Sequence, residues 1–309
     1  MFVVEDLVKR YGRFVAVDHL SMTVERGHVF GFVGPNGAGK TTTMRIAATL
    51  LAPTSGSVRV AGFDVMEEPI KVRRKIGYMP DFFGVYDNLK AMEYLDFYGA
   101  SYGIPYKERQ KTAEGLLNLV GLANKRDNYV DSLSRGMKQR LCLARSLMHD
   151  PELLILDEPA SGMDPRARVE LKNILKELKN MSKTILISSH ILSELSEMCD
   201  SIGIIEHGRL VVSGDVKNIM ETVSGRLTVR IKLLDDMDRA INILKEQPLV
   251  SDIFQEDDML EIGYKGKDED LWPLLKTLVA NDVPIISFNK TDGNLEKVFM
   301  EVTQDEEMV

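Results

Sequence analysis

The chain has 309 residues, 44% of them hydrophobic and 28% charged, and its formal net charge is −8 at pH 7. This length leaves room for about two domains with sizeable cores, and the negative charge gives no long-range attraction to nucleic acid, so we expect no nucleic-acid partner. Cys142 and Cys199 stand far apart without metal-ligand spacing, which favours reduced thiols in a cytoplasmic protein.

The first predicted elements surround a glycine-rich loop. A short strand over 2–7 contains Glu5 and Asp6, which is not typical of a signal peptide. The apolar run His28–Val33 then predicts a buried strand that enters the loop, and Thr42–Leu50 predicts a helix that leaves it. In the loop, two glycines flank four residues and a lysine and a hydroxyl follow; its members are Gly34, Pro35, Asn36, Gly37, Ala38, Gly39, Lys40 and Thr41.

This loop predicts a site for a nucleoside triphosphate. Glycines let backbone N–H groups wrap a phosphate, and the helix that starts at Thr42 turns its positive end toward the anion. Lys40 is expected to face solvent without ligand and to reach the terminal phosphates, while the Thr41 hydroxyl would ligate magnesium. The alternative is a glycine-rich turn without a ligand, which the flanking strand and helix disfavour.

Residues from about 82 to 150 are helical by pattern and contain a second candidate anion site. Ser134 is a suitable N-cap for an amphipathic helix, and Gly136 allows a ligand to approach the backbone closely. Taken alone, this segment is more typical of a capped helix with no further role.

The run 153–156 is apolar throughout and ends in two acids, Asp157 and Glu158. A continuous apolar run is typical of a strand buried on both faces of a parallel sheet, and ligands bind at the carboxyl edge of such sheets. Asp157 is therefore a candidate magnesium ligand, and Glu158 a candidate general base for an attacking water. The alternative is that these acids only cap the next helix.

The order of these three motifs resembles the ATP-binding cassette of ABC transporters, over roughly residues 1–222. The resemblance implies a P-loop NTPase-like α/β fold, with a mixed sheet core and a helical subdomain at about 82–150. It also implies ATP and Mg²⁺ as cofactors. In this family Ser134 and Gly136 would contact the nucleotide that a second cassette holds.

Smaller features agree with the resemblance. Tyr11 stands where the family carries an aromatic that stacks on adenine, and His190 ends a strand where a histidine senses the terminal phosphate. The segment Ser161–Asp164 matches the loop that crosses to the partner cassette.

Three residues depart from the family pattern. Asp81 replaces a glutamine, so it could act at the catalytic site or touch magnesium but cannot donate a hydrogen bond. Arg135 and Met137 replace the second glycine and the glutamine of the signature. Arg135 either strengthens nucleotide contact across the dimer or is a solvated surface residue. These departures resemble ATPases that serve separate export permeases.

After about residue 223 the pattern changes to a small β-α-β-β-α-β unit that extends to 309 and ends in a helix over 295–301. This accessory domain contains no catalytic cluster, and its single Trp272 is expected in the core.

The sequence thus predicts an ATP-hydrolysing subunit that drives the separate membrane permease of an exporter. The subunit is expected to form a dimer, and specifically a homodimer. No apolar stretch approaches the ~20 residues of a membrane-spanning helix, so the chain is expected on the cytoplasmic face of the membrane, bound through the permease. The aromatics at 82, 83 and 86 are candidate docking residues. The alternatives are an ABC ATPase acting in translation or DNA repair, and a cassette that senses ATP without hydrolysing it.

Overall fold

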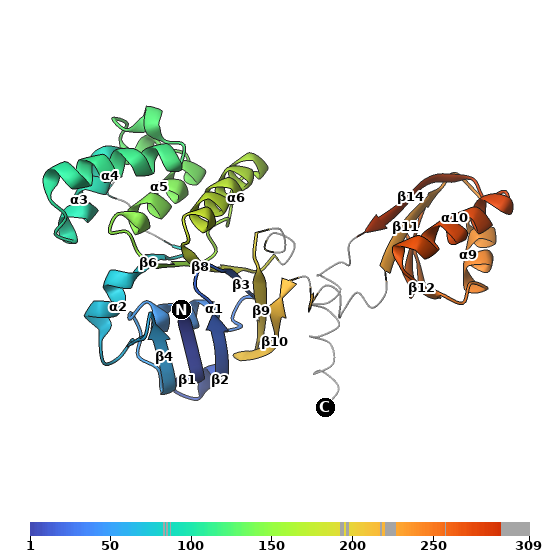
Figure 1. Ribbon diagram of the computed structural model, residues 1–309, viewed down its shortest axis with the longest axis horizontal. Helices are drawn as coiled ribbons and strands as arrows, with labels where there is room; N and C mark the ends of the chain where they lie inside the picture. The colour runs from blue at the N-terminus through green and yellow to red at the C-terminus, as the bar shows by residue number, and fades with distance from the viewer. Residues whose placement is uncertain are drawn as a thin grey trace. The chain divides into compact units, whose positions relative to one another are not determined.

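The computed structural model describes residues 1–291 except 83, 85, 87, 192–194, 196–197, 217, 220–226 and 257. The chain divides into two compact units, Met1–Gly214 and Asp215–Val309 (Figure 1). The sequence predicted that the cassette ends at residue 222. The observed boundary, after Gly214, lies earlier in the chain. No helix in the described ranges combines the length and the apolar character needed to cross a membrane.

A six-stranded sheet forms the centre of the first unit. Its order is β10-β9-β3-β8-β7-β6, with parallel pairing from β9 through β6. The strands are β3 (Val29–Val33), β6 (Ile76–Met79), β7 (Leu153–Leu156), β8 (Thr184–Ser189), β9 (Ser201–Glu206) and β10 (Arg209–Asp215). Because β3, β7 and β8 are parallel neighbours, the loops that follow them meet at one edge of the sheet.

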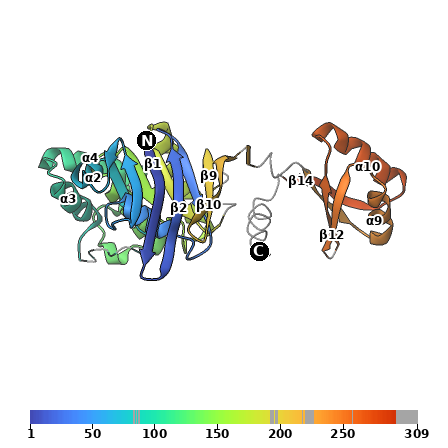
Figure 2. The same ribbon diagram turned by 90° about the horizontal axis from the view of Figure 1, so that it is seen from below.

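A second, antiparallel sheet has the order β2-β1-β4-β5. Its strands are β1 (Phe2–Tyr11), β2 (Phe14–Val24), β4 (Ser55–Val60) and β5 (Phe63–Asp64). Between the two sheets lies α1 (Lys40–Ala47), whose Met44 and Ile46 join Phe2 and Phe32 in one buried cluster (Figures 1 and 2). Packing on both sides therefore holds the start of α1 at the edge where β3, β7 and β8 end.

The region expected to be helical forms a separate group of helices on the other side of the six-stranded sheet (Figure 1). It contains α3 (Ala91–Ser101), α4 (Tyr106–Leu119), two short 3-10 turns (Ala123–Lys125 and Val130–Ser132) and α5 (Arg135–Leu147). The helices α2 (Pro69–Lys75) and α6 (Pro165–Asn180) precede β6 and β8. Asp164 caps α6 by accepting from the backbone N–H of Ala167 at 2.9 Å, and proline occupies the first turn.

The second unit has the predicted β-α-β-β-α-β order. It consists of β11 (Leu227–Leu233), α9 (Met237–Lys245), β12 (Val250–Glu256), β13 (Met259–Tyr264), a 3-10 turn (Asp268–Asp270), α10 (Leu271–Ala280) and β14 (Ile285–Thr291). The strands pair antiparallel in the order β12-β13-β11-β14, the arrangement of a split βαβ motif. The helix expected over 295–301 lies outside the described residues.

Trp272 corrects one expectation. Its exposure is 68%, whereas Leu274 and Leu278 of the same helix are buried against the sheet. Residues two apart on a helix point to opposite sides, so a helix that buries Leu274 leaves Trp272 in solvent.

Candidate functional site

Glycine permits the tight course of the loop between β3 and α1. A Cβ atom on Gly34 would lie 2.2 Å from the carbonyl oxygen of Ile205, and Gly39 adopts a φ of +108°. Any larger residue would clash at the first position and be strained at the second. The loop therefore packs against β9 while its backbone stays open toward a ligand.

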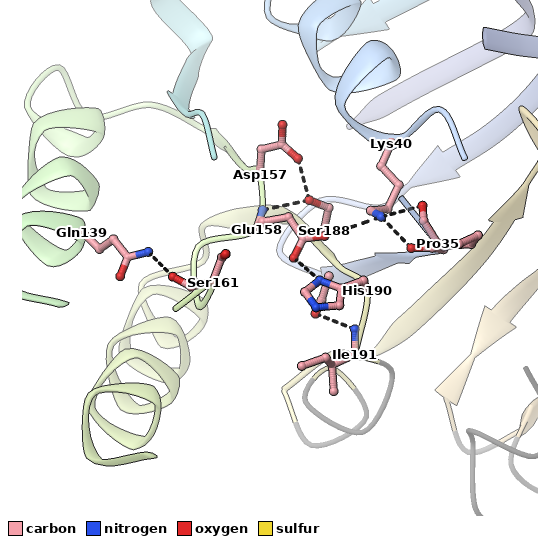
Figure 3. A network of polar contacts seen from close by, with 11 residues as sticks. Pro35, Lys40, Gln139, Asp157, Glu158, Ser161, Ser188, His190 and Ile191 are labelled. Carbon is pink, nitrogen blue, oxygen red and sulfur yellow. Dashed lines mark hydrogen bonds and ion pairs between the residues drawn. The ribbon is translucent and has the colours of Figure 1, made fainter. Parts of the chain in front are cut away.

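Lys40 is buried, not solvent-facing as expected from the sequence. Its exposure is 5%, and its Nζ donates to the carbonyl oxygens of Gly34 at 2.5 Å and Pro35 at 3.1 Å (Figure 3). The same Nζ lies 3.5 Å from Oε1 of Glu158. A buried cation needs such partners, and the two loop carbonyls and the Glu158 carboxylate supply them.

Ser188 connects the two acids that follow β7. Its Oγ donates to Oδ1 of Asp157 at 2.8 Å and accepts from the backbone N–H of Glu158 at 2.9 Å (Figure 3). We did not predict this residue from the sequence, although a polar side chain near the carboxyl end of a buried parallel strand was a usable signal. From its position on β8, Ser188 orients both of the acids that follow β7.

Glu158 occupies a strained position. Its φ of +48° is in the left-handed region, which non-glycine residues enter at a cost. One carboxylate oxygen, Oε2, lies 2.9 Å from Nδ1 of His190 (Figure 3). The structure thus brings together Lys40 at the start of α1, Glu158 after β7 and His190 after β8.

Asp157 fits a cation site better than a capping role. Its exposure is 0%, and its Oδ2 has no hydrogen-bond partner. Burial raises its pKa, while hydrogen bonds from Ser188 and Thr41 act in the opposite direction and the nearby charge of Asp81 adds to the rise. In the described part of the chain no group of three His, Cys, Asp or Glu residues forms a metal cluster. Asp157 and Thr41, together with oxygens from a bound phosphate, would hold Mg²⁺, which usually keeps few protein ligands.

A pocket of ≈ 230 Å³ lies over the loop. Most of the predicted nucleotide-site residues line it, together with two residues that were not predicted, Phe14 and Ala16; the full lining is Tyr11, Phe14, Ala16, Pro35, Asn36, Gly37, Gly39, Lys40, Thr41, Thr42, Asp81 and Glu158. Tyr11 and Phe14 are paired residues at the β1–β2 turn and are 48% and 62% exposed. The pocket therefore offers aromatic rings suited to a base beside a cradle suited to phosphates.

Ser134 and Gly136 are not part of this pocket lining. Ser134 caps α5, its side chain accepting from the backbone N–H of Met137 at 3.3 Å, and it is exposed. The guanidinium of Arg135 lies against Gly162 of its own chain, where a Cβ would meet it at 2.4 Å. Arg135 is exposed, but its contact with Gly162 shows that it is more than a solvated surface residue.

Comparisons with known proteins agree with this geometry. The ABC transporter family model matches residues 17–161. The chain is 31% identical to the linearmycin resistance ATP-binding protein LnrL of Bacillus subtilis (strain 168), over 98% of each chain. It is 34% identical to the bacitracin transport ATP-binding protein BcrA of Bacillus licheniformis, over 96% of this chain and 95% of that protein.

A solved ATP-binding subunit of an ABC transporter superposes with a TM-score of 0.66 at 30% identity, over 72% of this chain and 93% of that one. The α/β cassette fold and the ATPase activity predicted from the sequence are therefore confirmed. The chain belongs to the ATP-binding subunits of ABC transporters, and its chemistry is the binding and hydrolysis of ATP.

Proposed function

We propose that two copies of this chain enclose two Mg²⁺-ATP and drive a separate membrane permease that exports its substrate. The observation that carries this proposal is the incomplete site: one chain supplies the phosphate cradle, but Ser134 and Gly136 are not among the residues lining it. Relatives are described as resistance, bacitracin transport and Nod factor export proteins, which supports the export direction.

A two-fold axis would complete both sites at once. The start of α5 is exposed and offers backbone N–H groups and the positive end of a helix, which suit a terminal phosphate. Placed against the cradle of a second copy, Ser134 and Gly136 would cover the nucleotide, and the same contact would repeat on the other side. ATP would then hold the two cassettes together, and hydrolysis would release them.

In this arrangement each residue near the phosphates has a distinct role. Lys40 would exchange its bonds with the Gly34 and Pro35 carbonyls for the β- and γ-phosphates. Glu158 would take a proton from the attacking water, and His190, 2.9 Å away, would hold that carboxylate in place. Mg²⁺, held by Thr41 and Asp157, would neutralise charge that develops on the phosphate oxygens.

A separate groove suits a permease segment. It has a volume of ≈ 310 Å³ and is lined by Ala48, Leu50, Arg73, Ile76, Tyr78, Tyr98, Tyr102, Arg145, Ser146 and His149. These residues come from the sheet core and from the helical group, so movement between the two would change the groove. Its walls are aromatic, and Tyr102 stacks on His149 with ring centroids 3.8 Å apart. Burial lowers the pKa of His149.

Arg145 indicates what the occupant carries. It lies over the Tyr98 ring at 5.1 Å and reaches the carbonyl oxygen of Tyr78 at 3.5 Å. The described lining of the groove contains Arg145 and Arg73 but no carboxylate. A short amphipathic helix of the permease, with an apolar face and an acidic side chain, would match this surface. The chain would then lie on the cytoplasmic face of the membrane.

The aromatic loop after Asp81 could extend the docking surface. Phe82 is 92% exposed, and Tyr86 is 53% exposed with its ring packed edge-on against Phe97 at 5.3 Å. The third aromatic of the hypothesis, Phe83, lies outside the described residues. We therefore assign the main docking role in this loop to Phe82.

Replacing both Leu50 and Phe82 with Ser is expected to release the chain from its membrane partner while leaving its own ATPase activity near the wild-type level. Leu50 is 62% exposed and Phe82 92% exposed, so neither stabilises the fold of the isolated chain much. As anchors in an interface they would carry a large share of the binding energy, and we expect at least about tenfold weaker association. The measurement is co-purification from detergent-solubilised membranes, with the captured integral membrane protein identified.

Tyr106→Ser provides the matched control, because Tyr106 is 62% exposed and lies outside the groove lining. It should co-purify like the wild type. Capture of no membrane protein by the wild-type chain would refute the proposed permease partner. Unchanged capture by the double variant would place the docking surface elsewhere.

A further inference from the structure

Helix α2 (Pro69–Lys75) exposes an apolar side chain between two cations. The helix lies at the margin of the first unit, on the same side as α3 (Figures 1 and 2). Val72 is buried against the unit, whereas Ile70 is 67% exposed. Arg73 and Arg74 follow Ile70 by three and four positions and are both exposed, so the three side chains share the outer face of the helix. Ile70 therefore stands in solvent with a guanidinium group on either side.

Leu50 extends this outer face toward the groove that suits a permease segment. Nε of Arg73 donates to Oγ1 of Thr49 at 2.7 Å, which holds the guanidinium beside Leu50. Leu50 is 62% exposed, and both Leu50 and Arg73 line the groove, whereas Ile70 and Arg74 are not among its lining residues. We call Leu50, Ile70, Arg73 and Arg74 the α2 surface. It is continuous with the groove and extends beyond it.

The two arginines of the α2 surface carry charge that their neighbours do not neutralise. Lys71 forms an ion pair with Glu68 at 2.6 Å, but in the parts of the chain that the structure describes neither Arg73 nor Arg74 pairs with a carboxylate. The exposed acid Glu67 precedes the helix, at the end opposite to the arginines. Cations in the last turn of a helix favour its dipole, but this effect does not account for an isoleucine left in solvent between them.

We propose that the α2 surface lies against anionic lipid headgroups of the membrane, beside the permease. Arginine donates two parallel hydrogen bonds to a phosphate, and an apolar side chain among cations can enter the boundary between headgroups and acyl chains. The positive charge of the surface is complementary to an anionic leaflet, although the whole chain carries a net charge of −8.

Continuity with the groove brings the α2 surface to the membrane, because a permease segment in the groove comes from the bilayer. The permease then holds the surface at a high effective concentration near the lipid, so that a weak lipid contact is sufficient. The position beside the permease rests on the proposed function. The lipid contact itself does not, and it can be measured without the permease.

Flotation of the nucleotide-free chain with protein-free vesicles tests the lipid contact. We expect binding to vesicles of phosphatidylglycerol and phosphatidylcholine, much weaker binding to phosphatidylcholine alone, and loss of binding in about 0.5 M NaCl, which screens the charges. The double variant Ile70→Ser, Arg74→Glu should weaken partition at least about tenfold, because each charge near an anionic surface contributes on the order of fivefold. Both residues are exposed and outside the ATP pocket lining, so ATP turnover and melting temperature should stay at wild-type values.

The double variant Val169→Ser, Lys176→Glu is the matched control. Both of its residues are exposed on α6, and it makes the same change in net charge and the same loss of an exposed apolar side chain. It should bind the vesicles like the wild type. An equal loss of binding in the two double variants would overturn the α2 surface, because net charge alone would then explain the effect. A wild-type chain without preference for anionic vesicles would overturn it as well.

Co-purification from detergent-solubilised membranes separates a lipid contact from a protein contact. Detergent disperses the bilayer, so the Ile70→Ser, Arg74→Glu variant should capture the permease as the wild type does. Loss of capture by this variant would overturn the proposal, since the α2 surface would then bind the permease itself. A wild-type chain that binds anionic vesicles but captures no membrane protein would support the lipid contact and refute the proposed permease partner, so the two failures are distinguishable.

Discussion

Replacing Glu158 with Gln is expected to lower ATP turnover by about a hundredfold or more, the scale of losing a general base. The amide keeps the shape of the side chain and leaves Lys40 and Asp157 in place, so ATP binding should persist. The amide nitrogen cannot accept the proton of the attacking water. Steady-state phosphate release and equilibrium ATP binding, measured on the same preparation, separate the two effects.

Glu152→Gln is the matched control for this variant. Glu152 precedes the same strand, β7, at its opposite end and pairs with Lys75 at 2.5 Å and Arg26 at 2.8 Å. Its replacement should leave turnover near the wild-type value. Undiminished hydrolysis by Glu158→Gln would show that another group, or water alone, accepts the proton.

The second large effect is expected for Lys40→Ala. Removing a charged hydrogen-bond donor to a phosphate costs about 1.5–3 kcal/mol, so ATP affinity should fall by about tenfold to a hundredfold, and turnover should fall with it. Because Lys40 is buried and bonded to the Gly34 and Pro35 carbonyls, the variant also leaves those oxygens without their donor. A lower melting temperature is expected as well, and thermal unfolding should accompany the binding measurement.

Lys75→Ala is suitable as the control, since it breaks an ion pair with Glu152 outside the pocket. It should bind and hydrolyse ATP normally. If Lys40→Ala did the same with Mg²⁺-ATP, the loop between β3 and α1 would be a structural turn and not a phosphate cradle.

The parts of the site that follow buried strands could be predicted because each motif is local. A glycine-rich loop between an apolar strand and a helix, or two acids after an apolar run, has few structural alternatives. The parallel sheet then brings Lys40, Glu158 and His190 together from distant positions.

Other features depend on contacts that no local pattern contains. Lys40 is buried because two carbonyls and a carboxylate surround it, and the sequence does not show that arrangement. Arg135 lies against Gly162 only because the loop after Glu158 folds back onto α5. Trp272 belongs to a helix with apolar residues on more than one face, and its pattern does not reveal which face meets the sheet.

Enclosure of ATP between two copies is tested most directly by the mass of the Glu158→Gln chain in solution, measured by light scattering without nucleotide, with Mg²⁺-ADP and with Mg²⁺-ATP. We expect the mass of the single chain, 34.8 kDa, without nucleotide and with ADP, and twice that mass with ATP. Adding Ser134→Arg to the same chain should keep it monomeric while ATP still binds. A chain that binds ATP at saturation and stays monomeric would contradict the claim that two copies enclose the nucleotide.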